Sequence, residues 1–274
     1  MKQISILGCG WLGLPLAKTL LEKGFSINGS TTSVEKIAVL EKAGILPFQI
    51  NLFEDRIEGN IDLFLSNSDI LIIDIPPKLR GNSTENFVAK IQNIIPFIEK
   101  SSVDKVIFVS STSVYADDNS IITEETKPNP DTESGRQLLE AEHILQSNKN
   151  FQTTIVRFGG LIGDDRHPIK FLAGRKNIEN PIGPINLIHQ IDCIGIIEAI
   201  LKHSETSGQN DKSNEVFNAV APFHPTRKKY YTKKAIDLDL SLPEFDESKP
   251  SVGKTILSDK VETVLNYKFE IKRY

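Results

Sequence analysis

The chain contains few of the residues and patterns on which several classes of protein depend. Only two of its 274 residues are cysteines, Cys9 and Cys193, which is too few for a disulfide framework and is typical of a reducing compartment. Acidic residues outnumber basic ones, and the formal net charge of -4 argues against a nucleic-acid-binding protein. No apolar run reaches the ~18 residues that a membrane-spanning helix needs. We therefore expect a cytoplasmic chain with no nucleic-acid or membrane partner.

Signatures of several catalytic classes are also missing. The histidines and carboxylates do not show the spacing of metal ligands, so the sequence predicts no metal site. Neither a P-loop nor a nucleophile elbow is present. The basic run at 227–229, with Lys233 and Lys234, is interpreted as the solvated face of a helix. The length is sufficient to bury a large core, either as one large α/β unit or as two closely joined lobes.

The most informative pattern that is present lies at the start of the chain. An alternating apolar run at 3–7 leads into GCGWLG at 8–13, and a helical pattern follows at 14–21. In this G-x-G-x-x-G spacing the first glycine permits a tight turn, the second lets a diphosphate approach the backbone, and the third lets the helix pack closely on the sheet. We predict a dinucleotide-binding turn made by Gly8, Gly10, Trp11, Leu12 and Gly13.

Strands and helices alternate through the first half of the chain. Gly24 and Gly44 stand where helix C-caps are expected. Several of the strands are apolar on both faces, as in parallel sheets covered by helices on both sides. The alternation predicts a doubly wound parallel sheet whose ligands gather at the carboxyl ends of the strands. The predicted strands are 3–7, 25–30, 46–50, 70–75, 105–110 and 153–157, and the predicted helices are 14–21, 34–43, 84–100 and 135–146.

The alternation of strands and helices becomes less regular after about residue 159. We expect a helix at 190–202, a polar loop at 203–214, a short strand at 216–218, a helix at 226–236 and a closing helix opened by Ser258. The predicted fold is an α/β Rossmann fold with a small C-terminal substrate lobe. Residues 1–160, together with about 186–218, form its dinucleotide-binding domain, and 161–185 and 219–274 form the substrate lobe and closing helix.

The end of the second predicted strand indicates which dinucleotide is bound. An NAD site usually presents Asp or Glu there, to grip the ribose 2′-hydroxyl. This chain has four hydroxyl residues with Lys36 nearby, and they could donate to a 2′-phosphate, which favours NADP over NAD; alternatively, Ser33 caps the next helix. Asn51 is expected at the adenine edge, and a rigid segment at 75–77 beside the ribose. The predicted cofactor-binding residues in these segments are Ser30, Thr31, Thr32, Ser33, Asn51, Ile75, Pro76 and Pro77.

A further set of motifs spans the rest of the chain. VSSTSVY at 109–115 resembles the S-S-x-x-V-Y signature of extended short-chain dehydrogenases/reductases, the group that contains the NAD-dependent epimerases and dehydratases. Segments at 157–163, 186–192 and 257–267 resemble later parts of the same family in the same order. The resemblance implies an NAD(P)-binding oxidoreductase, epimerase or dehydratase acting on a small polar or nucleotide-linked substrate. It also implies a homodimer that pairs through helices at 84–100 and 135–146.

One departure from the family is decisive for the chemistry. In the family a Tyr-x-x-x-Lys pair follows, whose tyrosine is the acid/base and whose lysine lowers the pKa of that tyrosine and holds the ribose. Here Ser134 stands at the tyrosine position and Leu138 at the lysine position. A serine hydroxyl is far too weak an acid or base to replace an activated phenol unaided. The chain therefore resembles an atypical branch of the family.

Several residues could still carry chemistry. Ser111 matches the position that orients a substrate oxygen, with ordinary backbone hydrogen bonds as the alternative, and Thr112 follows it. Arg136 is either a fixed cation facing the site or a solvent-facing side chain. Within 163–168, a region resembling one that touches substrate, Arg166 could bind a phosphate or carboxylate, and His167 is expected to titrate near neutrality. The predicted catalytic residues are Ser111, Ser134 and Arg136, and the predicted substrate contacts are Ser111, Thr112, Arg166 and His167.

These features leave three functional hypotheses open. The first is an NADP- or NAD-dependent enzyme that uses a relocated acid, since the cofactor itself carries the reactive bond in hydride transfer. The second is a non-catalytic NADP(H)-binding sensor or regulatory protein, because both the tyrosine and the lysine are absent. The third is a scaffold that binds dinucleotides weakly.

Overall fold

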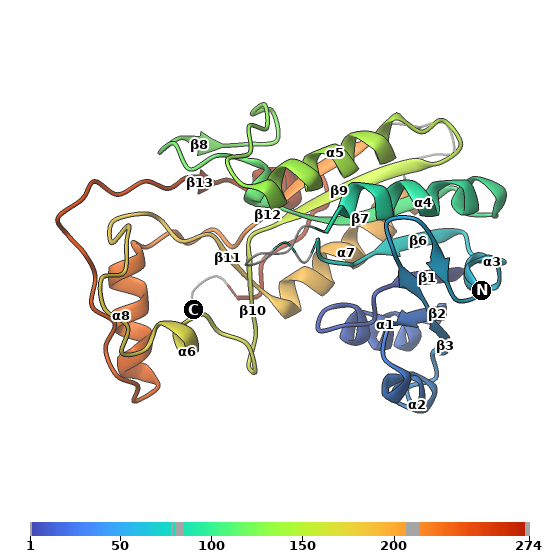
Figure 1. Cartoon of the computed structure of the whole chain (residues 1–274), viewed down its shortest axis with the longest axis horizontal. Helices are drawn as coiled ribbons and strands as arrows, with labels where there is room; N and C mark the ends of the chain where they lie inside the picture. The colour runs from blue at the N-terminus through green and yellow to red at the C-terminus, as the bar shows by residue number, and fades with distance from the viewer. Residues whose placement is uncertain (1, 78, 80–84, 207–213, 272–274) are drawn as a thin grey trace.

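A parallel sheet forms the centre of the molecule (Figure 1). The computed structural model describes residues 2–77, 79, 85–206 and 214–271. Within these ranges the central sheet has seven strands in the order β12-β9-β7-β6-β1-β2-β3, and every neighbouring pair is parallel. The strands are β1 (Gln3–Leu7), β2 (Ser26–Thr31), β3 (Leu46–Gln49), β6 (Ile70–Ile73), β7 (Lys105–Ser111), β9 (Gln152–Phe158) and β12 (Glu215–Ala219).

Helices cover both faces of this sheet, in an arrangement visible in Figure 1. One apolar cluster joins Leu16, Ile196 and Val261 to one face, and a second joins Phe64 and Ile91 to the other. All four residues of β6 are buried, as expected for a strand covered on both sides. The first face carries α1 (Gly13–Glu22), α2 (Ile37–Lys42), α7 (Gln190–Thr206) and α9 (Asp259–Thr263), and the second carries α3 (Ile61–Leu65), α4 (Phe87–Lys100) and α5 (Glu133–Ser147).

This architecture confirms the predicted fold class, a doubly wound parallel sheet. The six strands and four helices predicted in the first half all occur, with ends that differ by a few residues. Gly24 and Gly44 follow α1 and α2 with φ of +87° and +80°, the left-handed conformation expected after a helix. The predicted helix at 84–100 begins at Phe87, and residue 84 lies outside the described residues.

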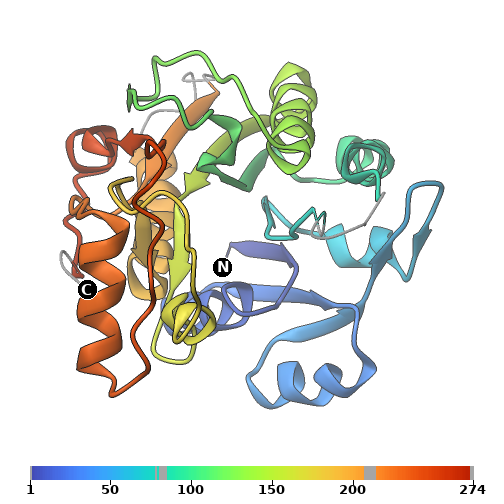
Figure 2. The ribbon, with the colours of Figure 1, turned by 60° about the vertical axis from the view of Figure 1, so that its left-hand side comes forward.

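Smaller elements extend from the sheet on the side of β9 and β12 (Figure 2). A third apolar cluster, which includes Ile169, Leu187 and Tyr230, joins two of these helices to a short strand. The predicted division into a dinucleotide-binding domain and a substrate lobe stays a prediction. The elements on this side are β8 (Ile121–Ile122), β10 (Gly160–Ile162), α6 (Ile169–Leu172), β11 (Leu187–His189), α8 (Arg227–Asp237) and β13 (Thr255–Ile256). Near the opposite edge of the sheet (Figure 2) lie β4 (Asn51–Leu52), β5 (Ile57–Glu58) and the single-turn helix η1 (Val34–Lys36), and a second single-turn helix, η2 (Thr112–Val114), follows β7.

Two predictions for the second half need correction. The helix predicted at 190–202 continues to Thr206, so the start of the predicted polar loop is helical. Ser258 precedes α9 but does not cap it, because its Oγ accepts a hydrogen bond from the Val220 amide and so ties the helix to the end of β12.

Two further observations concern the helices and the cysteines. Across the described ranges, no helix is long and apolar enough to cross a membrane. Cys9 and Cys193 are both buried and unpaired.

Candidate functional site

The glycine turn joins β1 to α1 at the carboxyl edge of the sheet. Gly8 has φ +110°, and a Cβ atom there would lie 2.3 Å from the Asp74 carbonyl oxygen. A Cβ atom at Gly13 would lie 2.3 Å from the Gly8 carbonyl oxygen, so this glycine lets the helix start close to the turn. At Gly10 the nearest atom to such a Cβ, the Gly8 carbonyl oxygen, is 3.9 Å away, and the residue is exposed. Two glycines therefore satisfy packing, while Gly10 keeps the outer surface of the turn open.

The outer surface of this turn presents hydrogen-bond donors. The Gly8 and Cys9 amides donate to the side chain and carbonyl of Ser30, which fix the turn to β2. Within the part of the chain that the structure describes, the amides of Trp11 and Leu12 have no acceptor. Helix α1 has no acidic residue in its first turn and no side-chain cap. An anion is favoured at such a position, because unpaired amides and the helix dipole both attract it.

A carboxylate that the sequence analysis did not single out lies beside this turn. Asp74 directly follows β6 and accepts a hydrogen bond from the Gly13 amide. Burial raises the pKa of its carboxyl to about 8, while the Gly13 amide and the Arg166 guanidinium oppose that rise. Asp74 could have been found from the sequence, because it is a single carboxylate at the end of an apolar strand.

Trp11 connects the glycine turn to the segment between β10 and α6. Its indole Nε1 donates to Asp165 at 2.9 Å, and the Arg166 guanidinium carbon lies 4.9 Å from its ring centroid. A Cβ atom at Gly163 would come within 2.8 Å of the same ring. Gln190, at the start of α7, donates to the Trp11 carbonyl oxygen at 2.6 Å. Arg166 is therefore placed at the glycine turn, where its cation could contact a diphosphate.

The end of β2 carries the hydroxyls predicted to contact the cofactor. Ser30 is buried and supports the glycine turn, as described above. Thr31 is buried too, and its Oγ1 accepts from the Ser33 amide at 3.1 Å. Ser33 precedes η1 without capping it, because its hydroxyl donates to the Glu35 carboxylate and lowers the pKa of that group. Thr32 is exposed. Glu35, the first carboxylate after β2, therefore contacts one of the predicted hydroxyls.

The remaining predicted cofactor residues follow β3 and β6. Asn51 lies on β4, half-buried. Ile75 packs against the glycine turn, with its Cγ2 3.1 Å from the position of a Cβ atom at Gly8. Pro76 is exposed and Pro77 half-buried. These residues share the edge of the sheet with the glycine turn.

A second group of candidates meets where β7 ends. Ser111 is half-buried and its Oγ accepts from the Ser113 amide at 3.1 Å, while Thr112 is buried. Helix α5 packs tightly here: a Cβ atom at Gly135 would lie 2.1 Å from the Ser113 carbonyl oxygen. The structure therefore brings Ser134, half-buried in the first turn of α5, to the same corner as the hydroxyls of η2. We call Ser111, Thr112, Ser113 and Ser134 the hydroxyl corner.

Two other positions of α5 do not join the hydroxyl corner. Leu138, at the family's lysine position, is 3% exposed and belongs to the apolar cluster under α4 and α5. Arg136 is exposed, and its Nε donates to Glu133 at 2.9 Å. Of the two alternatives for Arg136, the structure shows the solvent-facing side chain. The hydroxyl corner therefore receives no cation from either residue.

A buried ion pair supports this corner from beneath. Glu142, fully buried on α5, accepts from the Ser110 hydroxyl and from the Arg157 guanidinium, whose Nη2 is 2.5 Å from Oε2. Arg157 also donates to the Tyr115 hydroxyl at 2.6 Å, and that hydroxyl donates to Asn218 at 3.1 Å. Burial raises the pKa of Tyr115, partly offset by Arg157. Tyr115 is thus a buried packing residue.

His167 does not titrate near neutrality, and that expectation is wrong. The ring is buried, its Nδ1 accepts from the Ile169 amide at 3.1 Å, and its Nε2 lies 2.7 Å from the Tyr230 hydroxyl. Burial, with Lys234 and Lys170 nearby, lowers the pKa to about 4. The uncharged ring joins α6 to α8 at neutral pH.

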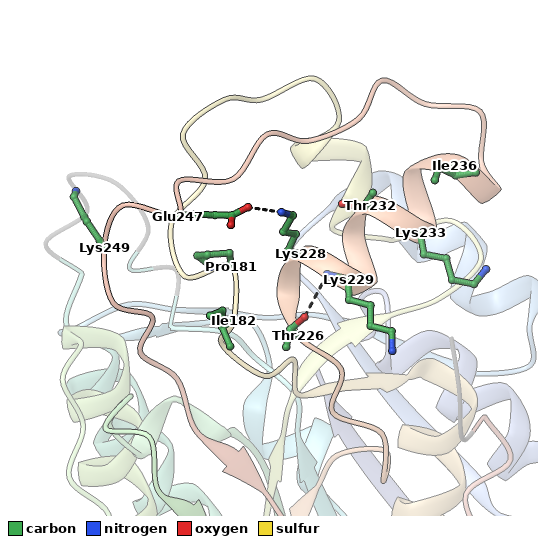
Figure 3. A pocket seen from close by; sticks show the side chains of 10 residues that line it. All are labelled: Pro181, Ile182, Thr226, Lys228, Lys229, Thr232, Lys233, Ile236, Glu247 and Lys249. Carbon is green, nitrogen blue, oxygen red and sulfur yellow. Dashed lines mark hydrogen bonds and ion pairs between the residues drawn. The ribbon is translucent and has the colours of Figure 1, made fainter.

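A separate pocket of about 560 Å³ lies over α8 (Figure 3). Lys228, Lys229 and Lys233 are exposed along it, and Lys228 pairs with Glu247. These three lysines confirm the interpretation of a solvated helix face, whereas Lys234 is half-buried and Arg227 is half-buried over the Tyr231 ring. No cluster of His, Cys, Asp and Glu able to hold a metal occurs among the described residues.

Solved structures of similar fold include proteins in complex with NAD. MoeE5 in complex with UDP-glucuronic acid and NAD has a TM-score of 0.78 and 16% identity, and the match covers 98% of this chain and 94% of that one. UDP-glucuronic acid 4-epimerase from Bacillus cereus, in complex with NAD, has a TM-score of 0.76 and 18% identity over the same shares. The chain therefore has a Rossmann-like fold similar to that of these two NAD-bound structures.

The sequence gives a more specific relationship. Protein YeeZ from Escherichia coli is 33% identical over 272 residues, which cover 98% of this chain and 96% of that protein. The chain belongs to the YeeZ family. A scan against models of protein families finds no match.

Proposed function

We propose that this chain binds a nicotinamide dinucleotide at the glycine turn. The observation that carries the proposal is the open outer surface at Gly10, where the amides of Trp11 and Leu12 have no acceptor among the described residues. These donors face the carboxyl edge of the sheet, where ligands of such folds bind. The resemblance in fold to structures solved with NAD supports the same assignment.

We propose NAD rather than NADP as that cofactor. The preference for NADP from the hydroxyls of Ser30 to Ser33 is not supported by the neighbours, whose bound cofactor is NAD. The Glu35 carboxylate, which accepts from the Ser33 hydroxyl, favours a ribose 2′-hydroxyl and repels a 2′-phosphate.

The favoured function is an NAD-dependent enzyme of the epimerase, dehydratase or oxidoreductase type. The two neighbours were solved with UDP-sugars, which supports a small nucleotide-linked or polar substrate. When bound, a nicotinamide supplies hydride transfer. The chain's own part is to hold a substrate oxygen with the hydroxyls of Ser111, Thr112 and Ser134, and to hold an anionic group with Arg166.

A second function, a non-catalytic NAD(H) sensor, is favoured by one observation. Leu138 is part of the apolar core, so no lysine can lower the pKa of an acid/base at the hydroxyl corner from that position. A protein without such a group could bind and release the dinucleotide without turning a substrate over.

Calorimetric titration with NAD, NADH, NADP and NADPH tests the binding proposal. We expect a single site, tighter for NAD and NADH. UDP-glucuronic acid, UDP-glucose and a panel of small carbonyl compounds are then added to the complex. Absorbance reports the redox state of the cofactor, and product analysis detects epimerisation that recycles it.

Each outcome decides between the functions. Turnover that falls in Ser111→Ala or Arg166→Gln supports the enzyme. Binding without turnover across the panel supports the sensor. Absence of heat with all four dinucleotides contradicts both and leaves the scaffold hypothesis.

A further inference from the structure

Asp74 occupies an unusual place for a carboxylate. It accepts from the Gly13 amide, at the first turn of α1, and a Cβ atom at Gly13 would lie 3.1 Å from its Oδ2. Its backbone is fixed as well, because the Asp74 amide donates to the Leu7 carbonyl oxygen at 2.9 Å. The side chain thus lies at the helix start to which a diphosphate would bind.

The charged and titratable groups around Asp74 are few. Arg166, from the segment between β10 and α6, is the cation that faces it. Cys9 on the glycine turn and Cys193 on α7 also interact with it, but burial raises the pKa of Cys9 to about 12 and that of Cys193 well above its usual value. Both thiols are therefore neutral, and Arg166 alone among these groups offsets the carboxylate's charge.

A diphosphate bound here would bring two negative charges next to this carboxylate. Like charges at short distance disfavour each other, and the protonated carboxyl is the form that relieves the repulsion. We propose that in alkaline solution Asp74 takes up one proton from solvent when a dinucleotide binds at the glycine turn, which makes cofactor affinity depend on pH. This inference rests on the proposed function, because it requires that a dinucleotide binds.

The direction of the dependence follows from the free protein. The pKa of Asp74 is about 8 without ligand, so at pH 7 the carboxyl is already protonated and binding needs no proton. Above pH 8 the free protein carries the carboxylate, and a proton must be taken up on binding. The dissociation constant should be flat from pH 6.5 to 7.5 and rise about tenfold between pH 8 and 9.5.

The test is calorimetric titration of NADH from pH 6.5 to 9.5, repeated at pH 8.5 in two buffers with different heats of ionisation. The buffer pair should report uptake of about half a proton or more at pH 8.5. In Asp74→Asn, whose side-chain oxygen can still accept from Gly13, both the pH dependence and the uptake should vanish. Asp62→Asn, an exposed carboxylate change on α3, is the matched control and should keep both.

A second variant keeps the test independent of the first. Arg166→Gln removes the cation that lowers the pKa of Asp74, so the rise in dissociation constant should begin above pH 8 instead of at it. A flat profile in the wild type, or an unchanged profile in Asp74→Asn, overturns the inference while the proposed function stands. Absence of NADH binding by the wild type at every pH overturns the proposed function, and the inference with it.

Discussion

The glycine turn and the hydroxyl corner lie on the same edge of one sheet but differ in how they are built. At the turn, Gly8 and Gly13 are required by close packing, Gly10 leaves the outer surface open, and unpaired amides face outward. At the hydroxyl corner, the ionisable groups Glu142 and Arg157 neutralise each other beneath the surface, and Leu138 is part of the core. One region is organised to hold a ligand, while the other offers hydroxyls without an activated acid or base.

This difference shows that binding and catalysis make separate demands on the same fold. Dinucleotide binding needs backbone geometry, which the sequence encodes with small residues at fixed spacing. Proton transfer needs a group whose pKa is shifted by a neighbour. Among the described residues at the carboxyl edge of the sheet, Asp74 has a carboxyl whose pKa is raised to about 8. This residue lies at the glycine turn and not at the hydroxyl corner.

The largest effect is expected from a matched pair of glycine substitutions. Gly8→Ala forces a Cβ atom onto the Asp74 carbonyl at a positive φ, and should destabilise the fold by about 4 kcal/mol or more. Gly10→Ala meets no neighbour within 3.4 Å, so its melting temperature should stay within about 2 °C of wild type. NAD binding should nevertheless weaken about 30-fold in Gly10→Ala, or about 2 kcal/mol. Thermal unfolding and calorimetry separate the two effects, and equal behaviour of both variants would contradict the distinction.

Removing one partner of the buried ion pair tests the support beneath the hydroxyl corner. Glu142→Gln leaves Arg157 buried without its counter-charge and should lower the free energy of unfolding by about 3–5 kcal/mol. Urea unfolding gives the value, with Glu140→Gln on the exposed side of α5 as the control, expected within about 0.5 kcal/mol of wild type. A loss below about 1 kcal/mol would show that the pair does not organise this region.

Truncating the residue at the family's lysine position sharpens the contrast further. Leu138→Ala should lower the free energy of unfolding by about 2–4 kcal/mol, because it empties a core position. The dissociation constant for NAD should change by less than about twofold, since an apolar side chain in the core grips no ribose. A large loss of NAD affinity in a folded variant would refute the assignment of Leu138 to the core alone.

The smallest effect concerns the choice of dinucleotide. Glu35→Gln removes the carboxylate at the end of β2, and should strengthen NADP binding about tenfold, or about 1.4 kcal/mol, while NAD binding changes little. Competition titrations with both dinucleotides measure the ratio. An unchanged ratio would place the determinant elsewhere, for instance at Lys36.

The sequence predicted most of the sheet because most of its strands are largely buried and appear in the sequence as apolar runs. Asp74 was missed because it lay inside the predicted strand 70–75, as a single polar residue in an apolar run. Local pattern also misread His167 and Ser258, because the partners that fix their roles, Tyr230 and Val220, are distant in the chain. Likewise, no spacing rule links Glu142 to Arg157, which meet only when α5 packs on β9.

A crystal structure of the wild-type chain grown with NAD tests the central claim most directly. We predict a diphosphate within hydrogen-bonding distance of the Trp11 and Leu12 amides, over the open face of Gly10. Density for NAD at another place, or none at a concentration that saturates the protein in solution, would contradict the account.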